Sequence, residues 1–499
     1  MSHLPPSGNT QEKSTLNLIY KLCKTLETEA ITYCHWKSNA ALDRSASGDN
    51  DLDLLISRAD GQRFTEILYR LGFKKAQSLP EKQLPGVLNF YGYDEKAEKI
   101  VHVHAHYQLI LGHDATKNYR LPIEKAFLAS VIQDDLFKIP APEFELIVFV
   151  IRMVIKHSTW DTILGRQGNL STTEKQELVY LSDRIDQSQL YSILDQHLPF
   201  LEKKLFDDCM QSLQPNCTIR FRIKVGQKLQ SRLKANIRRS QSFDVLLKLW
   251  RHFFWKVRKR IFRQPMKKYL DNGGAIIAIV GGDGSGKSTS VDELNTWLSK
   301  NFATIKVHLG KPPRSWGVIF VRVALKVEGW LGFRSNKISM VKKAATAAPL
   351  EFPGYARLMW HVLTAYDRYR AYQKARRFAT NGGLVICDRY PLPQIELMDG
   401  ASIEQMVNPE STNRLVNFMI KLEKKYYQHI MLPDLLIVLK IDPEIAVQRK
   451  TDEDAAYVRI RNQQIWALDW KRLPVHVIHA GQPRADVLNQ IKSLVWSRL

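Results

Sequence analysis

Short hydrophobic runs alternate with longer amphipathic stretches in the C-terminal half of the chain. Ala275–Val280 is uninterrupted and apolar, as expected of a strand buried on both faces of a parallel sheet. Similar runs follow at Ile305–Leu309, Leu384–Cys387, Leu435–Ile441 and Val475–Ile478. Strands that alternate with helices predict an α/β fold, in which helices flank a parallel sheet.

The N-terminal half mixes helix and strand patterns. Apolar residues recur at helical spacing in Ser14–Leu26, while Asp51–Ile56 and Lys99–His104 have the character of strands. Residues 120–215 are predicted to be mostly helical, with Glu143–His157 as a strongly apolar helix that begins after a proline pair. This pattern predicts an α+β domain followed by a helical extension.

A chain of 499 residues is too long for one ordinary hydrophobic core, so several domains are expected. The predicted boundaries are an α+β domain, a helical extension, a basic connector made of helices, and an α/β domain. They span 13–118, 119–218, 219–272 and 273–499, and residues 1–12 are predicted to form a loose tail.

The formal net charge of +23 has a local origin. Residues 220–268 hold seventeen Lys or Arg and one acid, Asp244, so this segment contributes +16 of the total. A concentrated positive charge indicates an anionic partner, such as nucleotides, nucleic acid or an acidic membrane surface.

Within this basic segment, residues 245–263 have the pattern of an amphipathic helix. Apolar side chains at helical spacing include Leu246, Trp250, Phe253 and Val257, and basic side chains occupy much of the rest. Such a helix suits an anionic membrane surface. It equally suits nucleic-acid phosphates, although no nucleic-acid motif accompanies it, and it also fits a connector packed on a neighbouring domain.

Cysteine usage and hydropathy favour a cytoplasmic protein, either free or peripheral to the inner face of the membrane. The five cysteines are scattered without a CxxC pair, which indicates reduced thiols. The N-terminus has no apolar signal core, and no run reaches the roughly 18 apolar residues of a membrane span. Leu146–Ile155, for example, contains Arg152.

A phosphate-binding loop follows the first C-terminal strand. Gly281 to Ser288 matches GxxxxGK[ST] between a buried strand and a helix. Glycines allow successive N–H groups to point at phosphate oxygens, Lys287 would bridge the β- and γ-phosphates of ATP, and Ser288 would ligate Mg²⁺. The alternative is a glycine-rich turn that matches by chance. The candidate cofactor-binding residues are Gly281, Gly282, Asp283, Gly284, Ser285, Gly286, Lys287, Ser288 and Thr289.

A carboxylate is predicted beside this loop. Gly383–Asp388 is an apolar strand that ends in an acid, and the carboxyl ends of parallel strands share one edge of the sheet. Asp388 could there hold Mg²⁺. The alternative is an acid that caps the next turn.

These motifs resemble thymidylate kinases over about residues 274–499. Asp283-Gly284 before Gly-Lys-Ser-Thr resembles the loop of that family, Asp388-Arg389-Tyr390 resembles its Asp-Arg-Tyr/His motif, and Asp367-Arg368 resembles a helix segment that ends in Asp-Arg. A late strand and helix, from Pro433 to Arg449, also match in order.

The resemblance implies roles for individual residues. Asp283 would contact the sugar of an acceptor nucleotide, Arg389 would hold its phosphate, and Arg368 would lie near the base, with Tyr390 as a further candidate substrate residue. Three arginines would supply lid charge to the transferred group, namely Arg449, Arg459 and Arg461. Gly310–Arg314 and the long basic stretch 315–350 depart from the family pattern around the acceptor, so the acceptor stays open.

A second candidate site lies near the N-terminus. Asp51 and Asp53 stand two residues apart on a predicted strand and therefore share a face. Two such acids can hold Mg²⁺ for nucleotidyl transfer. The alternative is a solvated turn.

The stretch from Cys34 to Asp53 resembles nucleotidyltransferase-like proteins of the polymerase-β superfamily. In that family a later strand supplies a third acid, whereas this chain has His102 in Val101–His106, with His104 and His106 following at alternate positions. Alternate histidines either bind a transition metal such as zinc or are partly exposed strand residues. The domain therefore either catalyses transfer or only binds a nucleotide.

These features favour an ATP- and Mg²⁺-dependent phosphotransferase that acts on a nucleoside monophosphate, dTMP or similar, or on another phosphorylated small molecule. Lys287, Asp388, Arg389 and Arg449 are its candidate catalytic residues, and Ser288, Asp388, Asp51 and Asp53 its candidate metal ligands. The alternative is an ATP-dependent scaffold or switch at a membrane surface, acting in surface glycan assembly.

Overall fold

The chain divides into two compact units, unit 1 over residues 1–266 and unit 2 over residues 267–499. The computed structural model describes residues 15–113, 115–157, 170–261, 267–313, 315–321, 323, 352–392, 400–407, 413–451, 453–470 and 474–499. Each unit is described by itself. The tail predicted at residues 1–12, Arg314 and most of the basic stretch 315–350 lie outside the described residues.

Unit 2 is built on a parallel five-stranded sheet in the order β12-β13-β11-β14-β15. This arrangement confirms the predicted α/β class, and every apolar run named above forms a strand. The elements of unit 2 are β10 Tyr269–Leu270, β11 Ala275–Gly281, α12 Lys287–Ser299, β12 Thr304–His308, α15 Tyr355–Thr380, β13 Leu384–Asp388, α16 Ile403–Met406, α17 Arg414–Gln428, β14 Leu435–Lys440, α18 Pro443–Arg449, α19 Ala455–Ala467, β15 Val475–His479 and α20 Arg484–Arg498.

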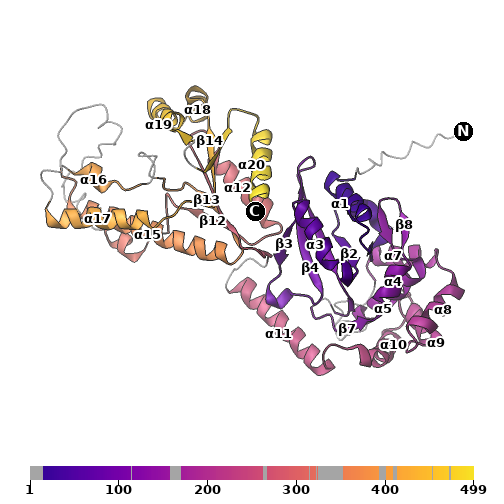
Figure 1. The fold of residues 1–499 in the computed structure, drawn as a ribbon. Coiled ribbons are helices and arrows are strands. Elements are labelled where there is room, and N and C mark those ends of the chain that lie inside the picture. Colours follow the sequence, from indigo (N-terminus) through magenta and orange to yellow (C-terminus); the bar gives the residue numbers. More distant parts are fainter. Residues whose placement is uncertain are drawn as a thin grey trace, which may run out of the picture. The chain divides into compact units, whose positions relative to one another are not determined.

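Helices cover both faces of this sheet (Figure 1). The side chains of Ile276, Ala278 and Val280 on β11 pack with residues of α15 and α19. On the other side, α12 and α20 pack against each other and against the sheet. The central strand β11 is completely buried from Ile276 to Ile279, because both of its faces are covered.

Unit 1 contains a mixed sheet, to which it contributes five strands in the order β1-β2-β5-β4-β3. The pair β2–β5 is parallel, while β1–β2, β4–β5 and β3–β4 are antiparallel. Its elements before the helical region are α1 Asn17–Thr28, β1 Tyr33–His35, α2 Leu42–Ala46, β2 Leu52–Ile56, α3 Gly61–Arg70, β3 Lys74–Gln77, β4 Val87–Asp94, β5 Lys99–His106, β6 Leu109–Leu111, β7 Tyr119–Leu121, α4 Glu124–Ala129, β8 Ile132–Asp134 and β9 Phe137–Ile139.

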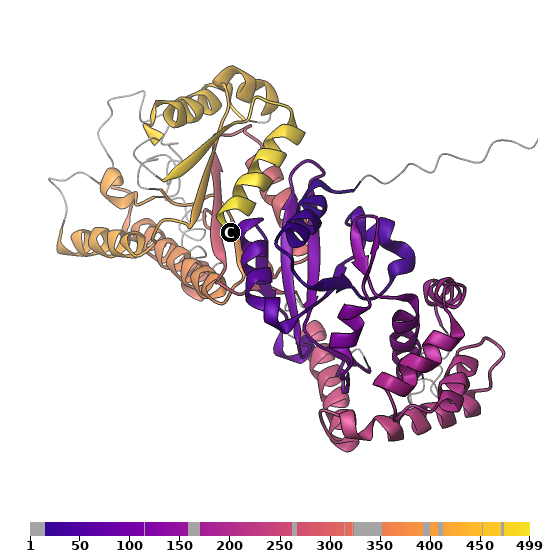
Figure 2. The same cartoon turned by 45° about the vertical axis from the view of Figure 1, so that its right-hand side comes forward.

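The helical region of unit 1 surrounds one apolar helix (Figure 2). That helix, α5 (Pro142–His157), is buried along almost its whole length and contacts α7, α8, α9 and α10. Mostly helical structure was predicted from residue 120, but β7 and the hairpin β8–β9 occupy part of 119–139, so continuous helix begins only at Pro142. The surrounding helices are α7 Thr172–Ser182, α8 Gln187–His197, α9 Lys203–Ser212 and α10 Ile219–Arg232.

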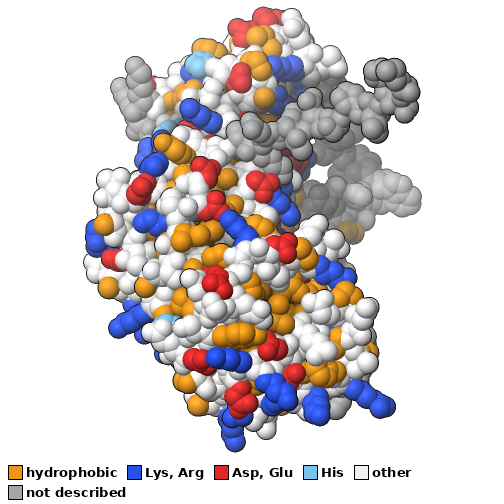
Figure 3. All heavy atoms as spheres, turned by 90° about the vertical axis from the view of Figure 1, so that its right-hand side faces the viewer, with side chains coloured by type: hydrophobic (Ala, Val, Ile, Leu, Met, Phe, Trp, Pro, Cys, Tyr) orange, Lys and Arg blue, Asp and Glu red, His pale blue; other side chains and the backbone are white. Residues whose placement is uncertain are grey.

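Part of the basic segment forms the long helix α11 (Gln241–Arg260), which confirms a helix over most of the predicted stretch 245–263; residues 262–263 lie outside the described residues. Among the described residues no helix combines the length and hydrophobicity needed to cross a bilayer. On the face of the molecule shown in Figure 3, acidic side chains lie among the basic ones. A surface with charges of both signs is expected where the excess of positive charge comes mainly from one segment, residues 220–268.

Candidate functional site

The glycine-rich loop lies between the end of β11 at Gly281 and the start of α12 at Lys287. Gly284 and Gly286 have φ values of +80° and +82°, which is the left-handed region that favours glycine. Gly286 is the residue before the first turn of α12. The loop thus turns sharply from the carboxyl end of the strand into a helix N-terminus, where backbone N–H groups can bind an anion.

The loop packs tightly against two helices that follow β14. A Cβ on Gly282 would lie 1.8 Å from Asn462 Oδ1, and one on Gly284 would lie 2.8 Å from the Ala446 carbonyl oxygen. Asn462 is buried, and its amide donates to the carbonyl oxygen of Asp283 at 3.1 Å. The conformation of the loop therefore depends on α18 and α19 as well as on its own glycines.

Lys287 points back into the loop. Its ammonium group donates to the carbonyl oxygen of Gly282, and its Nζ lies 3.9 Å from Asp283 Oδ1. Burial, with a further contribution from the nearby arginines, lowers the pKa of Lys287 to about 8. Such a position, closed on one side by the loop, is where an ammonium could reach the phosphates of a nucleotide.

Two arginines from distant elements also converge on Asp283. Arg461 Nη1 on α19 lies 2.7 Å from Asp283 Oδ2, and Arg389 Nη2 lies 3.8 Å from Asp283 Oδ1. Asp283 is itself almost fully buried. Together with Lys287, three cations surround this one carboxylate at the mouth of the loop.

Asp388 lies beside the loop, as the sheet register requires. It ends β13 and is paired with Ile279 of β11, two residues before Gly281. Ser288 Oγ donates to Asp388 Oδ2 at 3.2 Å. Within the described residues the buried Oδ1 of Asp388 has no hydrogen-bond partner. Two adjacent oxygen groups, one of them unsatisfied, fit the preference of Mg²⁺ for oxygen ligands.

The residues after Asp388 turn away in different directions. Arg389 has a φ of +59°, an uncommon conformation for a side chain of this size, and this turn directs its guanidinium toward Asp283. Tyr390 is 3% exposed, and its hydroxyl donates to the Met431 carbonyl oxygen. The Arg389 guanidinium therefore lies beside the glycine-rich loop, while the Tyr390 hydroxyl makes a buried hydrogen bond to the backbone.

Other predicted site residues make structural contacts. Arg368 of α15 donates from Nε to the Leu309 carbonyl oxygen at 2.9 Å and from Nη2 to that of Gly310 at 3.1 Å. Arg449, at the end of α18, donates to the Ala480 carbonyl oxygen at 2.9 Å.

The remaining predicted residues lie closer to the surface or within the loop. Arg459 forms a two-point ion pair with Glu444 at 2.6 and 2.8 Å on the surface. Ser285 Oγ donates to the Gly282 carbonyl oxygen at 2.8 Å, and Thr289 is exposed on the first turn of α12. Of the three proposed lid arginines, Arg461 is the one that reaches the loop.

Asn462 was not identified from the sequence. It lies next to Arg461 on α19, and an asparagine in a helix gives no local signal of a role. Only its distance from Gly282 and its hydrogen bond to Asp283 show that it supports the loop.

Asp53 of unit 1 lies among basic side chains from two other parts of the unit. Lys37 Nζ lies 2.9 Å from Asp53 Oδ1, and the same oxygen is 3.2 Å from His104 Nδ1 and 3.4 Å from His106 Nε2. Burial alone would favour neutral Asp53, but Lys37 and the histidines outweigh it and hold the pKa of Asp53 well below its usual range. Burial lowers the pKa of His106 to about 4.

A cavity of about 630 Å³ opens beside Asp53 and Lys37. Its wall is rich in cationic side chains, among which Arg152 pairs with Glu177 at 3.3 Å and Lys156 with Glu174 at 2.8 Å. The cationic residues that line it are Lys37, Arg44, Lys117, Arg152 and Lys156.

No protein-family profile matches the chain. It is 29% identical over 240 residues to the Uncharacterized ATP-binding protein YghR of Escherichia coli K12, a match that spans 46% of this chain and 89% of that protein. It is 29% identical over 187 residues to the Uncharacterized ATP-binding protein YghS of the same strain, spanning 36% and 75%. A Probable thymidylate kinase of Picrophilus torridus is 24% identical over 180 residues, spanning 36% and 68%.

These similarities support a nucleotide-binding, P-loop-like domain. The parallel sheet of unit 2 and its flanking helices are compatible with that fold.

Proposed function

We propose that unit 2 is an ATP-dependent phosphotransferase that moves the γ-phosphoryl group of ATP to a phosphorylated small molecule. The observation that carries this proposal is the convergence of Lys287, Arg461 and Arg389 on the mouth of a glycine-rich loop, beside the Ser288–Asp388 pair. The names of the relatives, two given as ATP-binding and one as a probable kinase, agree with it.

Each of these groups has a physical task in such a reaction. The N–H groups of the loop and the Lys287 ammonium would bind the β- and γ-phosphates, which fixes the position of the phosphorus atom. Arg461 would stabilise the negative charge that spreads over the transferred group. Mg²⁺ held near Ser288 and Asp388 would neutralise charge on the phosphates.

The acceptor would enter beside Arg389. An acceptor phosphate oxygen forms a bond to the γ-phosphorus while the bond from that phosphorus to the bridging oxygen breaks, which leaves ADP. A nucleoside monophosphate, dTMP or similar, is the acceptor that we favour. Arg389, whose guanidinium lies 3.8 Å from Asp283, would hold its phosphate, and Asp283 would accept a hydrogen bond from its sugar.

The proposal is tested with purified full-length protein, γ-labelled ATP and Mg²⁺, offered nucleoside monophosphates and phosphorylated sugars one at a time. We expect labelled product with at least one acceptor and its loss in Lys287→Ala, by about a thousandfold or more. Lys300→Ala, a surface lysine just after the end of α12, is the matched control and should keep full activity. Equal turnover in Lys287→Ala and wild type would show that the site is elsewhere.

A second candidate function, attachment to an anionic membrane surface, rests on the way α11 is oriented. Three polar side chains at seven-residue spacing hold the helix to unit 1: Asp244 accepts from Thr116 at 3.0 Å, Arg251 donates to Ala115, and Arg258 lies 3.7 Å from Glu81. Arg251 is the residue of α11 that is buried. The helix therefore turns its polar face toward its own unit, the reverse of an ordinary surface helix.

The opposite face of α11 presents apolar side chains to solvent. Leu246, Leu249 and Phe253 are 63%, 62% and 62% exposed, and Trp250 is 47% exposed. Exposed Lys256, Lys259 and Arg260 accompany them near the C-terminal end of the helix. A row of leucine and aromatic side chains with adjacent cations complements the interface of an anionic bilayer. On this basis the phosphotransfer site would operate at a membrane surface.

A further inference from the structure

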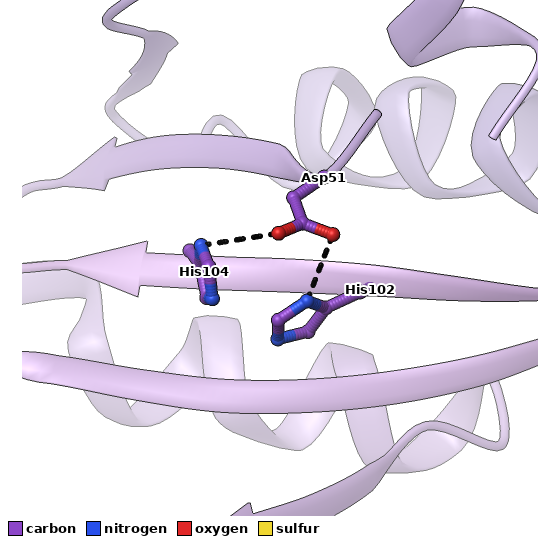
Figure 4. Close-up of side chains that lie close together, drawn as sticks. All are labelled: Asp51, His102 and His104. Carbon is purple, nitrogen blue, oxygen red and sulfur yellow. Dashed lines mark ion pairs between the residues drawn. The ribbon is translucent and has the colours of Figure 1, made fainter. Parts of the chain in front are cut away.

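Three histidines of β5 lie against the acidic start of β2 in unit 1. Asp53 is paired with His104 across the parallel β2–β5 ladder, so Asp51 lies level with His102. His102, His104 and His106 are two residues apart and project from the same face of the sheet. Figure 4 shows the carboxylate of Asp51 between the rings of His102 and His104.

The spacing of the three side chains suits a small tetrahedral cation. Asp51 Oδ1 lies 2.9 Å from His102 Nδ1, and Asp51 Oδ2 lies 3.7 Å from His104 Nδ1. Ligands bound to zinc at about 2.0–2.1 Å in tetrahedral geometry are about 3.4 Å apart. The donor atoms of Asp51, His102 and His104 all lie within 4.8 Å of one another, so small side-chain rotations would bring them to that separation.

The surroundings of His102 orient it as a ligand. Its Nε2 lies 3.2 Å from Asn89 Oδ1 on β4, and its ring stacks on Tyr91 with centroids 4.2 Å apart and an angle of 2°. When Nε2–H donates to Asn89, a neutral imidazole directs the lone pair of Nδ1 toward Asp51. The 2.9 Å separation is that of a hydrogen bond, so a proton on Nδ1 accounts for the contact with Asp51, and a metal ion bound by both groups would take the place of that proton.

The neighbouring group around Asp53 is less suited to a metal ion. Asp53, His104 and His106 also meet the spacing of a three-ligand site. There, however, the Lys37 ammonium already lies 2.9 Å from Asp53 Oδ1 and neutralises it. Among the residues that the structure describes, the ion-pair partners of Asp51 are the two histidines, and its side chain is 48% exposed, which leaves a path for an ion and room for a further ligand.

We propose that Asp51, His102 and His104 bind one divalent transition-metal ion of the zinc class, with a fourth position open to water. Imidazole nitrogen is a good ligand for such ions and a poor one for Mg²⁺, which prefers oxygen. Three protein ligands with an open position are typical of zinc sites that act on a bound ligand rather than of closed structural sites. This site is separate from the loop of unit 2 and does not depend on its function.

The test uses the full-length protein, freed of metal with a chelator and titrated with Co²⁺. Tetrahedral Co²⁺ bound to imidazole gives a visible absorption band that reports on its ligands. We expect one Co²⁺ per chain, displaced by an equimolar amount of Zn²⁺. A large excess of Mg²⁺ should leave the band unchanged.

Variants assign the ligands. We expect His102→Gln and Asp51→Asn each to lower the Co²⁺ affinity by at least tenfold to a hundredfold, the effect of losing one protein ligand. His106→Gln, on the same strand, and His479→Gln, on β15 of unit 2, are matched controls that should bind as wild type. The urea midpoint of each variant shows whether unit 1 still folds.

Three results would overturn the proposal. One is the absence of Co²⁺ binding to the wild-type protein, which needs no variant to fold. Another is displacement of the Co²⁺ band by Mg²⁺ at similar concentration, which would indicate an oxygen site. The third is loss of binding in His106→Gln with no loss in His102→Gln, which would place the ion on Asp53 instead.

Discussion

Arg461 Nη1 lies 2.7 Å from Asp283 Oδ2, although the two residues are 178 positions apart in the chain. Asp283 belongs to the glycine-rich loop and Arg461 to α19, one of the last helices. Lys287 and Arg389 lie within 4 Å of the same carboxylate. In this arrangement Asp283 is the counter-ion of the cations that we assign to phosphate binding.

The Asp283→Asn substitution tests whether Asp283 takes the place of the nucleotide phosphates as the partner of these cations. Removing the carboxylate leaves Lys287, Arg389 and Arg461 close together without their shared anion, so we expect the variant to lose about 1–3 kcal/mol of stability without nucleotide. ATP would then supply the missing negative charge. The increase in Tm on adding Mg²⁺-ATP should therefore be larger in Asp283→Asn than in the wild type, as measured by a thermal-shift assay. An equal or smaller increase would contradict the role of Asp283 as counter-ion.

The Gly282→Ala substitution tests the packing of the loop on α19. Its new Cβ would overlap the side chain of Asn462, which cannot move without losing its hydrogen bond to the Asp283 carbonyl oxygen. Overpacking of this kind costs about 1–3 kcal/mol. We expect at least tenfold weaker ATP binding by calorimetry. Gly481→Ala is the matched control, since among the described residues its Cβ would come within 4 Å of Ile445 alone, and binding should stay as in the wild type.

Arg389 and Tyr390 are adjacent but are expected to respond differently to substitution. Tyr390→Phe removes a buried hydrogen bond to Met431 and should cost about 1 kcal/mol of stability with phosphotransfer unchanged. Arg389→Ala should raise the KM for the acceptor about tenfold to a hundredfold, because a charge-assisted contact is lost, and should leave the KM for ATP nearly unchanged. Steady-state kinetics with each substrate varied in turn distinguishes the two. A loss of acceptor affinity in Tyr390→Phe would contradict the assignment.

The exposed face of α11 predicts binding to vesicles. Replacing Leu249 and Phe253 together by Glu removes apolar area and adds negative charge, so we expect co-sedimentation with vesicles that contain anionic lipid to fall by tenfold or more. Leu415→Glu with Phe418→Glu, exposed apolar positions on α17, is the matched control. Equal binding of the α11 variant and the wild type, or equal binding to neutral and anionic vesicles, would exclude this surface. Binding to oligonucleotides instead would assign the helix to nucleic acid.

Glu145 on α5 predicts a dependence of stability on pH. Burial raises the pKa of Glu145 to about 8, and within the part of the chain that the structure describes its Oε1 has no hydrogen-bond partner. Between pH 4.5, its ordinary value, and pH 8 the unfolded chain is ionised at this position while the folded chain keeps the proton. The free energy of unfolding therefore falls as the pH rises through this window.

The Glu145→Gln substitution should flatten that dependence, because the amide cannot ionise. A difference of one in pKa corresponds to about 1.4 kcal/mol, so at pH 8 we expect the variant to be more stable than the wild type by on the order of a few kcal/mol. At pH 4.5 the two should be similar. Urea unfolding at several pH values measures this, with the surface variant Glu66→Gln as control. A wild-type pH dependence that persists in Glu145→Gln would show that another group is responsible.

Local patterns in the sequence were sufficient to predict the sheet of unit 2 and the glycine-rich loop that follows β11. An uninterrupted apolar run such as Ala275–Val280 forms a buried strand because few other structures can bury every side chain in succession. Glycines at Gly284 and Gly286 mark left-handed turns that other residues adopt only with strain. Asp388 could be placed beside the loop because parallel strands end at the same edge.

The short strands of unit 1 could not be predicted from the sequence, because local patterns are weak there. β6, β7, β8 and β9 have three residues each and carry little periodicity, so pairing with a partner strand decides their conformation. The orientation of α11 also could not be predicted from the sequence. Its amphipathic pattern predicts a helix, but which face is covered depends on Thr116, Ala115 and Glu81, which lie far away in the chain.

By itself the sequence determined the strands of the unit 2 sheet and the long helices α5 and α11, since those elements depend on neighbours within a few positions. The tertiary structure alone decided which residues meet. It brought Arg461 rather than Arg449 or Arg459 to the loop, placed Asn462 against Gly282, and paired Asp51 with His102 and His104. Contacts over such separations arise only when strands pair and helices pack, and no local preference encodes them.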